Sequence, residues 1–426
     1  MTPYARATMD PNQGGPPEGR EWAGGYPSSD PRDAERLDPV LAPTMPGPLA
    51  AVDDEALRRA AEERRLEADR LGGKVHGGLL RWVLLALVGS VSAVLLGRPD
   101  AALFLAMATL FALTQSWDVR DRARMGELRD EPSLEPGGVG TALRVLVPLV
   151  IPVASGICYA AMGSFARSLP TTAAHVAAMR WSWAAAAVCL SMTIPDVSRL
   201  VARSFFARSA PSYTARLTAS IALALLLLPV PMRLLIDELL TFAGGGGRPL
   251  VDVGSLVAQL VGEVVLSVGA VGLWVARDAR AVRERLGLFG VNVRQALIGA
   301  AGLTAVMLVN GGMEALEHAR FPALWAADQA MGRMIAGSLS PAASVVLGVS
   351  AGVGEELLVR GALQPRAGLL WASLLFAAAH VQYTWFGMVT IAMLGITLGL
   401  VRNRANTTTA ILVHAVYDII AALGAK

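Results

Sequence analysis

The feature that most constrains this sequence is a series of apolar stretches, each about 18 residues or longer, that recur from residue 79 onward. A helix of that length crosses the hydrocarbon core of a bilayer, which is about 30 Å thick. Hydrophobic residues make up 54% of the chain and charged residues only 17%, whereas soluble domains average about 25% charged residues. The sequence therefore predicts an all-α protein, a polytopic bundle of transmembrane helices.

The apolar pattern predicts about eleven spans and three regions along the chain. The spans cover residues 79–97, 101–117, 142–163, 174–195, 214–236, 251–275, 293–310, 340–361, 368–383, 385–402 and 407–424. Ser340 followed by Pro341 favours a helix start, because serine caps a helix and proline is tolerated at its first position. The regions are a cytoplasmic tail at 1–75, N-terminal transmembrane helices of unassigned role at 76–300, and a C-terminal core at 301–426.

The first region is predicted to be a disordered tail that contains one charged helix. Residues 1–50 are rich in proline and glycine and carry mixed charge, a composition that cannot bury enough apolar surface to fold. Residues 53–71 are rich in Ala, Leu, Glu and Arg, which predicts a solvated helix. We expect this helix to end at Gly72 and Gly73, since glycine often terminates helices.

The distribution of arginine predicts the orientation in the membrane. Arginines gather in alternate connections, notably around residues 120–129, 199–208 and 277–285. Because cytoplasmic loops carry an excess of basic residues, this pattern places the N-terminus in the cytoplasm. The arginine-rich composition suggests a bacterial inner membrane as the location. No basic cluster is dense enough for a nucleic-acid surface, and we expect the lipid bilayer and a peptide substrate as partners instead.

Ionisable residues deep in apolar sequence are expensive in a membrane and point to function. They gather in the last four predicted spans and are Glu355, Glu356 and Arg360 in the eighth, His380 in the ninth, and His414 and Asp418 in the eleventh. Glu263 in the sixth span, with Gln259 one turn earlier, is interpreted as a helix contact. The residues of the last spans are thus predicted to converge on one polar pocket.

Helical spacing suggests how these side chains are arranged. Glu356 and Arg360 are four residues apart, so they share a helix face and can form an ion pair. Glu355 points about 100° away from Glu356 and is left free to face a cavity. Asp418 lies one turn after His414 and can accept a hydrogen bond from its ring, which fixes the tautomer.

This set of residues contains the parts of a hydrolase. Glu355 and His380 can hold a water molecule and take its proton, and His414 can donate a hydrogen bond to a developing oxyanion. In an alternative chemistry, Glu355, His380 and His414 are candidate ligands of Zn²⁺. No HExxH motif occurs, so the common arrangement of zinc ligands on one helix is not present in the sequence.

The same residues resemble the CPBP family, which comprises type II CAAX prenyl endopeptidases and the bacteriocin-processing and immunity proteins also called Abi. The family motifs are EExxxR, FxxxH, and HxxxN or HxxxD. The matching residues are Glu355, Glu356 and Arg360; Phe376 and His380; and His414 and Asp418. The resemblance covers roughly residues 300–424 and leaves residues 79–300 unexplained.

The resemblance implies a membrane-helix bundle that hydrolyses peptide bonds at a site reached from the cytoplasm. It implies that Glu355 and His380 activate water, that His414 and residue 418 bind the oxyanion, and that Glu356 and Arg360 support the site. Members have been described both as metalloproteases and as metal-independent glutamate proteases, so the resemblance leaves the need for zinc open.

One departure from the family pattern bears on the substrate. Prenyl-protein members usually have Asn where this chain has Asp418, and an ionised Asp cannot donate to an oxyanion. The departure favours a role for Asp418 in orienting His414 or in binding a metal ion, and it argues against a prenylated substrate. Two other functions fit the same residues: a non-catalytic scaffold or immunity protein of the same fold, and a transporter that uses buried acids as a relay.

Overall fold

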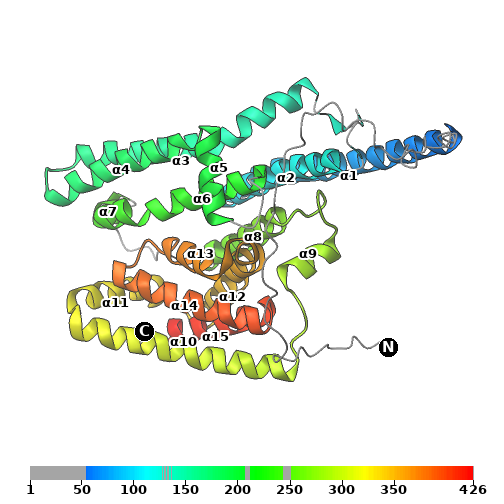
Figure 1. Cartoon of the computed structure of the whole chain (residues 1–426). Helices are drawn as coiled ribbons and strands as arrows, with labels where there is room; N and C mark the ends of the chain where they lie inside the picture. Colours follow the sequence, from blue (N-terminus) through cyan, green and yellow to red (C-terminus); the bar gives the residue numbers. More distant parts are fainter. Residues whose placement is uncertain are drawn as a thin grey trace, which may run out of the picture. The chain divides into compact units, whose positions relative to one another are not determined.

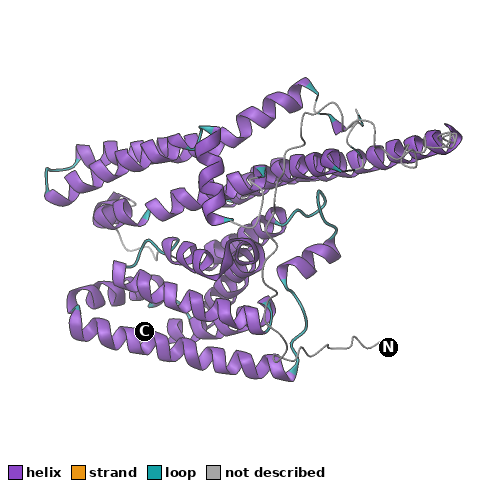
Figure 2. Ribbon diagram, viewed as in Figure 1, coloured by secondary structure: helices purple, strands orange, loops and turns teal. Residues whose placement is uncertain are grey.

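The structure is a computed structural model that describes residues 54–206, apart from 127, 129, 130, 132, 133 and 136, and residues 212–242 and 251–425. The part of the predicted tail up to residue 53 lies outside the described residues. The chain divides into two units, Met1–Leu57 and Arg58–Lys426, and the residues of the predicted site all lie in the second. Within the described ranges the regular elements are helices, apart from one isolated bridge between Leu273 and Arg277 (Figures 1 and 2).

The helices follow one another along the chain in the order α1 to α15, with one π-helical segment, η4, between α12 and α13. Their bounds are α1 Asp54–Leu95, α2 Pro99–Met125, α3 Gly138–Ser168, α4 Ala173–Ser191, α5 Pro195–Phe205, α6 Tyr213–Leu227, α7 Pro229–Phe242, α8 Val253–Ala270, α9 Ala279–Leu286, α10 Val293–Arg320, α11 Pro322–Ala336, α12 Pro341–Glu356, η4 Leu357–Leu363, α13 Gln364–Ala378, α14 Trp385–Arg404 and α15 Thr407–Gly424.

The predicted polytopic helical fold is confirmed. Among the described residues, eight helices are long and apolar enough to cross a membrane, or up to ten if two bent helix pairs each form one span. The bent pairs are α4 with α5 and α6 with α7. This number of spans is roughly consistent with the predicted eleven, because Pro341–Ala378, which counts as one helical stretch of 38 residues, holds the two spans predicted at 340–361 and 368–383. That stretch bends at Gly368, whose φ of 84° is not helical.

The predicted helix end at Gly72 and Gly73 is wrong, because α1 continues through both glycines to Leu95. Each glycine costs a helix only about 0.5–1 kcal/mol relative to alanine, and packing on the far side of the pair offsets that cost. Val75 and Trp82 are buried against α2 and the segment that follows α8. Trp82 also donates its indole N–H to the carbonyl of Leu273, at 2.9 Å.

Helix α12 is held closely between α15 and α8. It begins as predicted, with the Ser340 side chain accepting from the backbone N–H of Ala343. Gly348 and Gly352 form a GxxxG pattern on the face toward α15, where an added Cβ at either position would lie 2.6–2.8 Å from atoms of α15. Small residues at this spacing allow two membrane helices to approach closely. The two glycines thereby bring the end of α12 next to His414 on α15.

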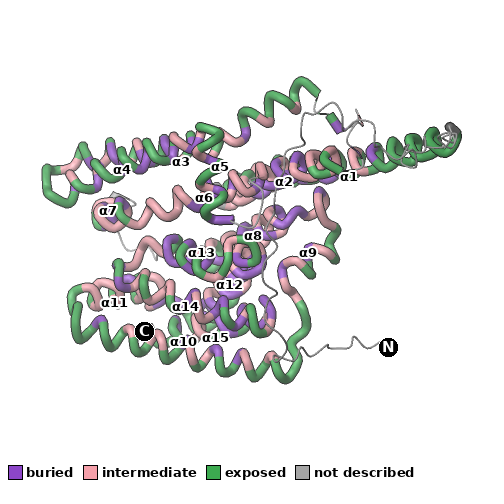
Figure 3. The backbone as a smooth tube through the Cα atoms, in the orientation of Figure 1, coloured by how far each residue is buried: buried purple, intermediate pink, exposed green. Residues whose placement is uncertain are grey.

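Burial separates the helices that carry the core from those that face outward. Half of the most apolar window of Pro341–Ala378 is buried, against 17% for the corresponding windows of α1 and α10. Figure 3 shows α10 and the N-terminal part of α1 as largely exposed, whereas α12 and α13 contain more buried residues. The large apolar side chains exposed on α1 and α10 suit contact with lipid.

The N-terminal helices pack against the C-terminal core. Phe205 of α5 packs against Trp371 of α13 in a tilted arrangement with ring centroids 4.6 Å apart. Phe206 and Ala222 join Leu375 in the same buried apolar cluster. Further along, α8 packs on both α2 and α12. Residues on α2, α6 and α8 therefore contribute walls to cavities that reach the C-terminal helices.

Candidate active site

The most deeply buried part of the site is an ion pair on one helix face. Glu356 and Arg360 are both fully buried, and Arg360 Nε donates to Glu356 Oε2 at 3.1 Å. The other oxygen of Glu356 lies 3.0 Å from His414 Nδ1. Arg360 also lies over the ring of Phe376, with Cζ 5.0 Å from its centroid. Glu356 and Arg360 thus link three elements, α12, η4 and α15, and present no group to solvent.

Glu355 points to the other side of the helix, toward both histidines. Its Oε2 lies 4.0 Å from His380 Nε2 and 4.0 Å from His414 Nε2. Its side chain retains 18% exposure, and its Oε2 has no hydrogen-bond partner. As the helical spacing predicted, the two carboxylates point in different directions. Glu356 forms an ion pair, and Glu355 faces open space.

The tautomer of His380 follows from its neighbours. Its Nδ1 lies 2.8 Å from the carbonyl oxygen of Phe376, which can only accept a hydrogen bond. Nδ1 therefore carries the proton in the neutral ring, and Nε2 presents a lone pair toward Glu355. The ring packs edge-on against Phe376, with centroids 4.8 Å apart. Phe376 thus sets both the position and the protonation of His380.

His414 is held between carboxylates. Its Nδ1 faces Glu356, and its Nε2 lies 3.3 Å from Asp418 Oδ2, one turn along the same helix. Carboxylate oxygens on both sides favour a ring that donates from both nitrogens. Asp418 is thus positioned to orient the imidazole, as the i,i+4 spacing suggested. A π-helical segment, η4, begins directly after Glu356, and such segments often occur at functional sites.

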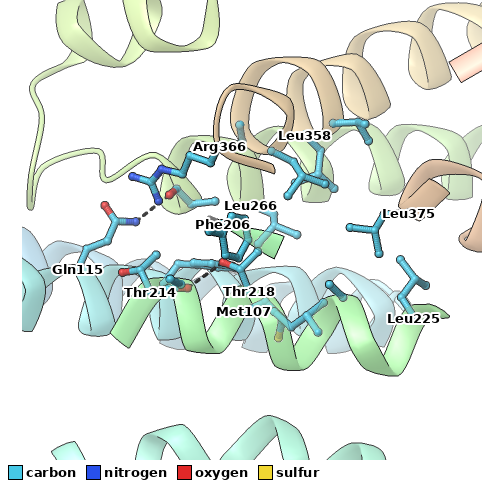
Figure 4. A pocket seen from close by; sticks show the side chains of 18 of the residues that line it. Met107, Gln115, Phe206, Thr214, Thr218, Leu225, Leu266, Leu358, Arg366 and Leu375 are labelled. Atoms are coloured by element: carbon cyan, nitrogen blue, oxygen red, sulfur yellow. Dashed lines mark hydrogen bonds between the residues drawn. The ribbon is translucent and has the colours of Figure 1, made fainter. Parts of the chain in front are cut away.

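Two cavities meet at this site. One, of about 840 Å³, is lined by residues of α2, α6, α8, α12, η4 and α13, and we call it the α2–α6 cavity. The other, of about 770 Å³, is lined mainly by residues of α10, α11, α14 and α15. Glu355 and His380 line both cavities. Figure 4 shows Arg366 and Gln115 at one end of the α2–α6 cavity, and Leu225 and Leu375 at the other.

The donor atoms do not form a ready zinc site. Ligand atoms about 2.0–2.1 Å from a tetrahedral zinc lie about 3.4 Å from one another. Glu355 Oε2 is 4.0 Å from the Nε2 atoms of His380 and His414, and His414 Nε2 lies closer to Asp418 than to Glu355. Across the ranges that the structure describes, no group of three or more His, Cys, Asp or Glu side chains is arranged to hold a metal ion.

Comparison with known families decides the identity of the C-terminal core. Residues 337–420 match the family model described as type II CAAX prenyl endopeptidase Rce1-like. These residues belong to the CPBP family. No curated protein and no solved structure matches the chain. The CPBP segment contains all seven residues of the three motifs, and its family is one of proteases, which supports an intramembrane protease.

One residue that lines the α2–α6 cavity was interpreted from the sequence as a helix contact. Glu263 of α8 is 8% exposed and lines this cavity together with Glu355 and His380. It lies outside the CPBP segment. The signal that could have identified it is the one used for the other acids, an ionisable residue in the middle of an apolar span.

Proposed function

We propose that this chain is an intramembrane endopeptidase in which Glu355 and His380 activate a water molecule. The observation that carries the proposal is the 4.0 Å separation between Glu355 Oε2 and His380 Nε2 at the junction of two cavities. A water molecule about 2.8 Å from each atom fits between them. It would donate one hydrogen to the carboxylate and one to the imidazole lone pair, which leaves an oxygen lone pair free to attack.

The hydrolysis would proceed by proton transfer through Glu355. As the water oxygen bonds to the scissile carbonyl carbon, Glu355 takes its proton. The C–N bond then breaks, and the same proton passes to the leaving amine. His414 Nε2 lies 4.0 Å from Glu355 Oε2, and its N–H, directed at Asp418 in the structure, would be shared between Asp418 and the oxygen that gains negative charge. Asp418 and Glu356 hold the His414 ring from either side.

The substrate class we propose is a peptide or a membrane-anchored protein. The α2–α6 cavity has a largely apolar wall, which suits an extended chain within the membrane. Arg122, Arg277 and Arg366 line the same cavity. Arg122 and Arg277 lie in the arginine-rich segments that the sequence predicts to be cytoplasmic, so we propose that the substrate enters from the cytoplasmic side with the N-terminus of the chain on that side. A bacterial inner membrane is the setting proposed for this orientation.

The proposed mechanism uses no metal. The ring of His414 is held by two carboxylates, and its release would be needed before it could bind zinc. Water activation by Glu355 and His380 needs no such rearrangement. Zinc-dependent chemistry on Glu355, His380 and His414 is the alternative that a chelator experiment tests.

The first experiment compares the peptide termini in host membranes that carry the wild type or Glu355→Gln at equal expression. Glu284→Gln provides a control, because Glu284 forms an exposed ion pair with Arg280 on α9. New termini that occur with the wild type and the control, but not with Glu355→Gln, are expected, and they would identify the substrate.

Identical termini in all three membranes would contradict the proposal. A scaffold or immunity role would then be tested by the capture of membrane partners with wild type and Glu355→Gln, which would bind equally. An activity that depends on a proton or ion gradient would favour a transporter instead.

A further inference from the structure

One end of the α2–α6 cavity carries three arginines to which the proposed mechanism gives no chemical role. They are Arg122 near the end of α2, Arg277 in the connection between α8 and α9, and Arg366 at the start of α13. Burial lowers the pKa of Arg277, and the charges of Arg366 and Arg122 lower it further, so the three lie near one another. Figure 4 shows Arg366 at the end of the cavity opposite Leu225. Three separate segments thus bring positive charge to one end of the cavity.

The acids at this end of the cavity are already engaged. Asp121 pairs with Arg144 at 3.0 Å. Asp118 caps the start of α6, where its two oxygens accept from two backbone N–H groups at 2.9 and 3.1 Å, and its charge also acts on Arg366. Among the described residues, neither acid forms an ion pair with any of the three arginines. The arginines are therefore available to an anionic group that enters the cavity.

The segment that carries Arg277 is held in a strained conformation. Trp274 has a φ of 65°, which is rare for a residue other than glycine. Its N–H donates to the carbonyl of Arg277 at 2.8 Å, and the Arg277 guanidinium donates to the carbonyl of Val271. Trp82 of α1 packs on the Trp274 ring, with centroids 5.5 Å apart. Such strain costs on the order of 1–3 kcal/mol and gathers at functional sites, so these contacts hold Arg277 at the cavity for a purpose.

We propose that Arg122, Arg277 and Arg366 bind an acidic side chain of the substrate and so determine its specificity, an inference that rests on the proposed function. Eleven residues of continuous helix lead from Glu355 to Arg366, before the bend at Gly368. At about 1.5 Å per residue this path is roughly 16 Å long. An extended peptide covers that distance in about five residues. The acidic residue of the substrate therefore lies about five residues from the bond that is cleaved.

The second cavity has the opposite charge, which gives the substrate a direction. It is lined by Glu314, Glu317 and Asp328, and no arginine or lysine is among its lining residues in the described part of the chain. An acidic side chain is therefore attracted at one side of Glu355 and repelled at the other. Specificity of this kind combines an attractive and a repulsive element.

The first test measures peptide binding and does not depend on cleavage. Full-length Glu355→Gln protein in phosphatidylcholine nanodiscs is titrated with a labelled peptide of Leu and Ala that ends in several Glu residues, and with a matched peptide that ends in Gln. The acidic peptide should bind about tenfold tighter or more, because hydrogen bonds to charged groups are the stronger ones. Arg277→Gln and Arg366→Gln should each reduce this preference, whereas Arg277→Lys, which retains the charge, should retain most of it. Arg283→Gln is the control, since Arg283 is exposed on α9 and does not line the cavity.

Two results of this titration would overturn the inference. One is equal affinity for the acidic and the Gln peptide in protein that is folded as judged by thermal unfolding. The other is a preference that disappears once phosphatidylglycerol is added to the nanodiscs, which would assign the arginines to lipid phosphate.

The second test uses the peptides identified from the membrane termini. Their sequences should be enriched in Asp or Glu about five residues from the cleaved bond, on one side only. Replacing that acid by Gln should lower kcat/KM about tenfold or more. Arg366→Glu should restore cleavage of a peptide in which the acid is replaced by Arg. Cleavage sites without the enrichment would contradict the inference, whereas cleavage by Glu355→Gln would contradict the proposed function and leave the binding result standing.

Discussion

The buried pair of Glu356 and Arg360 allows a sharp stability prediction, because α9 contains an exposed counterpart. The buried pair has 0% side-chain exposure on both partners, whereas Arg280 and Glu284 are 84% and 47% exposed. Both pairs join residues four apart. A difference in their energetic effect would therefore come from burial rather than from spacing.

The perturbation is Arg360→Met, which keeps much of the side-chain volume but removes the charge. It leaves Glu356 buried with His414 as its remaining partner. Breaking a buried pair by removing one partner costs about 3–5 kcal/mol, and the bond to His414 favours the lower end. Arg280→Met removes an exposed pair, worth about 0.3–0.5 kcal/mol. The ratio of the two losses is therefore expected to be sixfold or more.

The assay is the free energy of unfolding in a bilayer-like micelle, measured for both single variants and for the double variant Glu356→Gln with Arg360→Met. The double variant should recover part of the loss, because it leaves no unpaired charge. The reasoning is refuted if Arg360→Met and Arg280→Met differ by less than about 0.5 kcal/mol. It is also refuted if the double variant loses as much stability as Arg360→Met alone, or more.

Four further outcomes are expected. Gly352→Ala should destabilise the protein by about 1–3 kcal/mol, because its Cβ would lie 2.7 Å from the backbone of α15; Gly311→Ala, with nothing within 4 Å, should not. Thr218→Trp, on the wall of the α2–α6 cavity, should raise KM for large substrates in a cleavage assay, and an unchanged KM would argue against this route. The backbone N–H of Ser255 lowers the pKa of Asp252, the cap of α8, so stability from this group is present above its unfolded pKa of about 3.9 and is lost as the pH falls. Asp252→Asn should flatten that part of a stability-versus-pH curve. Chelators should leave cleavage unchanged, whereas loss of cleavage that added zinc restores would favour the metal alternative.

Several features of the fold and the site were predictable from local sequence. The length of the apolar stretches predicted the polytopic helical fold, and Ser340 followed by Pro341 predicted the start of α12. The i,i+4 rule gave the contact between Glu356 and Arg360. These features depend on neighbours within one or two helical turns, where geometry is fixed by the helix itself. The catalytic roles assigned to the motif residues remain predictions, which variants such as Glu355→Gln test.

Other features needed contacts between distant segments. The glycines at 72 and 73 did not end a helix, because Val75 and Trp82 gain burial against segments far away in sequence. The spans predicted at 340–361 and 368–383 follow each other within the stretch from α12 to α13, which kinks at Gly368, whose backbone is not helical.

The sequence by itself determined the helical membrane fold and the identity of the acids and histidines in the last spans. Only the tertiary structure decided which oxygen faces which nitrogen, that Glu355 and His380 adjoin both cavities, and that Glu263 of α8 lies beside Gly354. The physical reason is that a helix sets the angles between its own side chains, whereas the contacts between helices depend on packing. Here that packing is set by Gly348, Gly352 and Gly354, whose missing side chains let α15 and Glu263 approach α12.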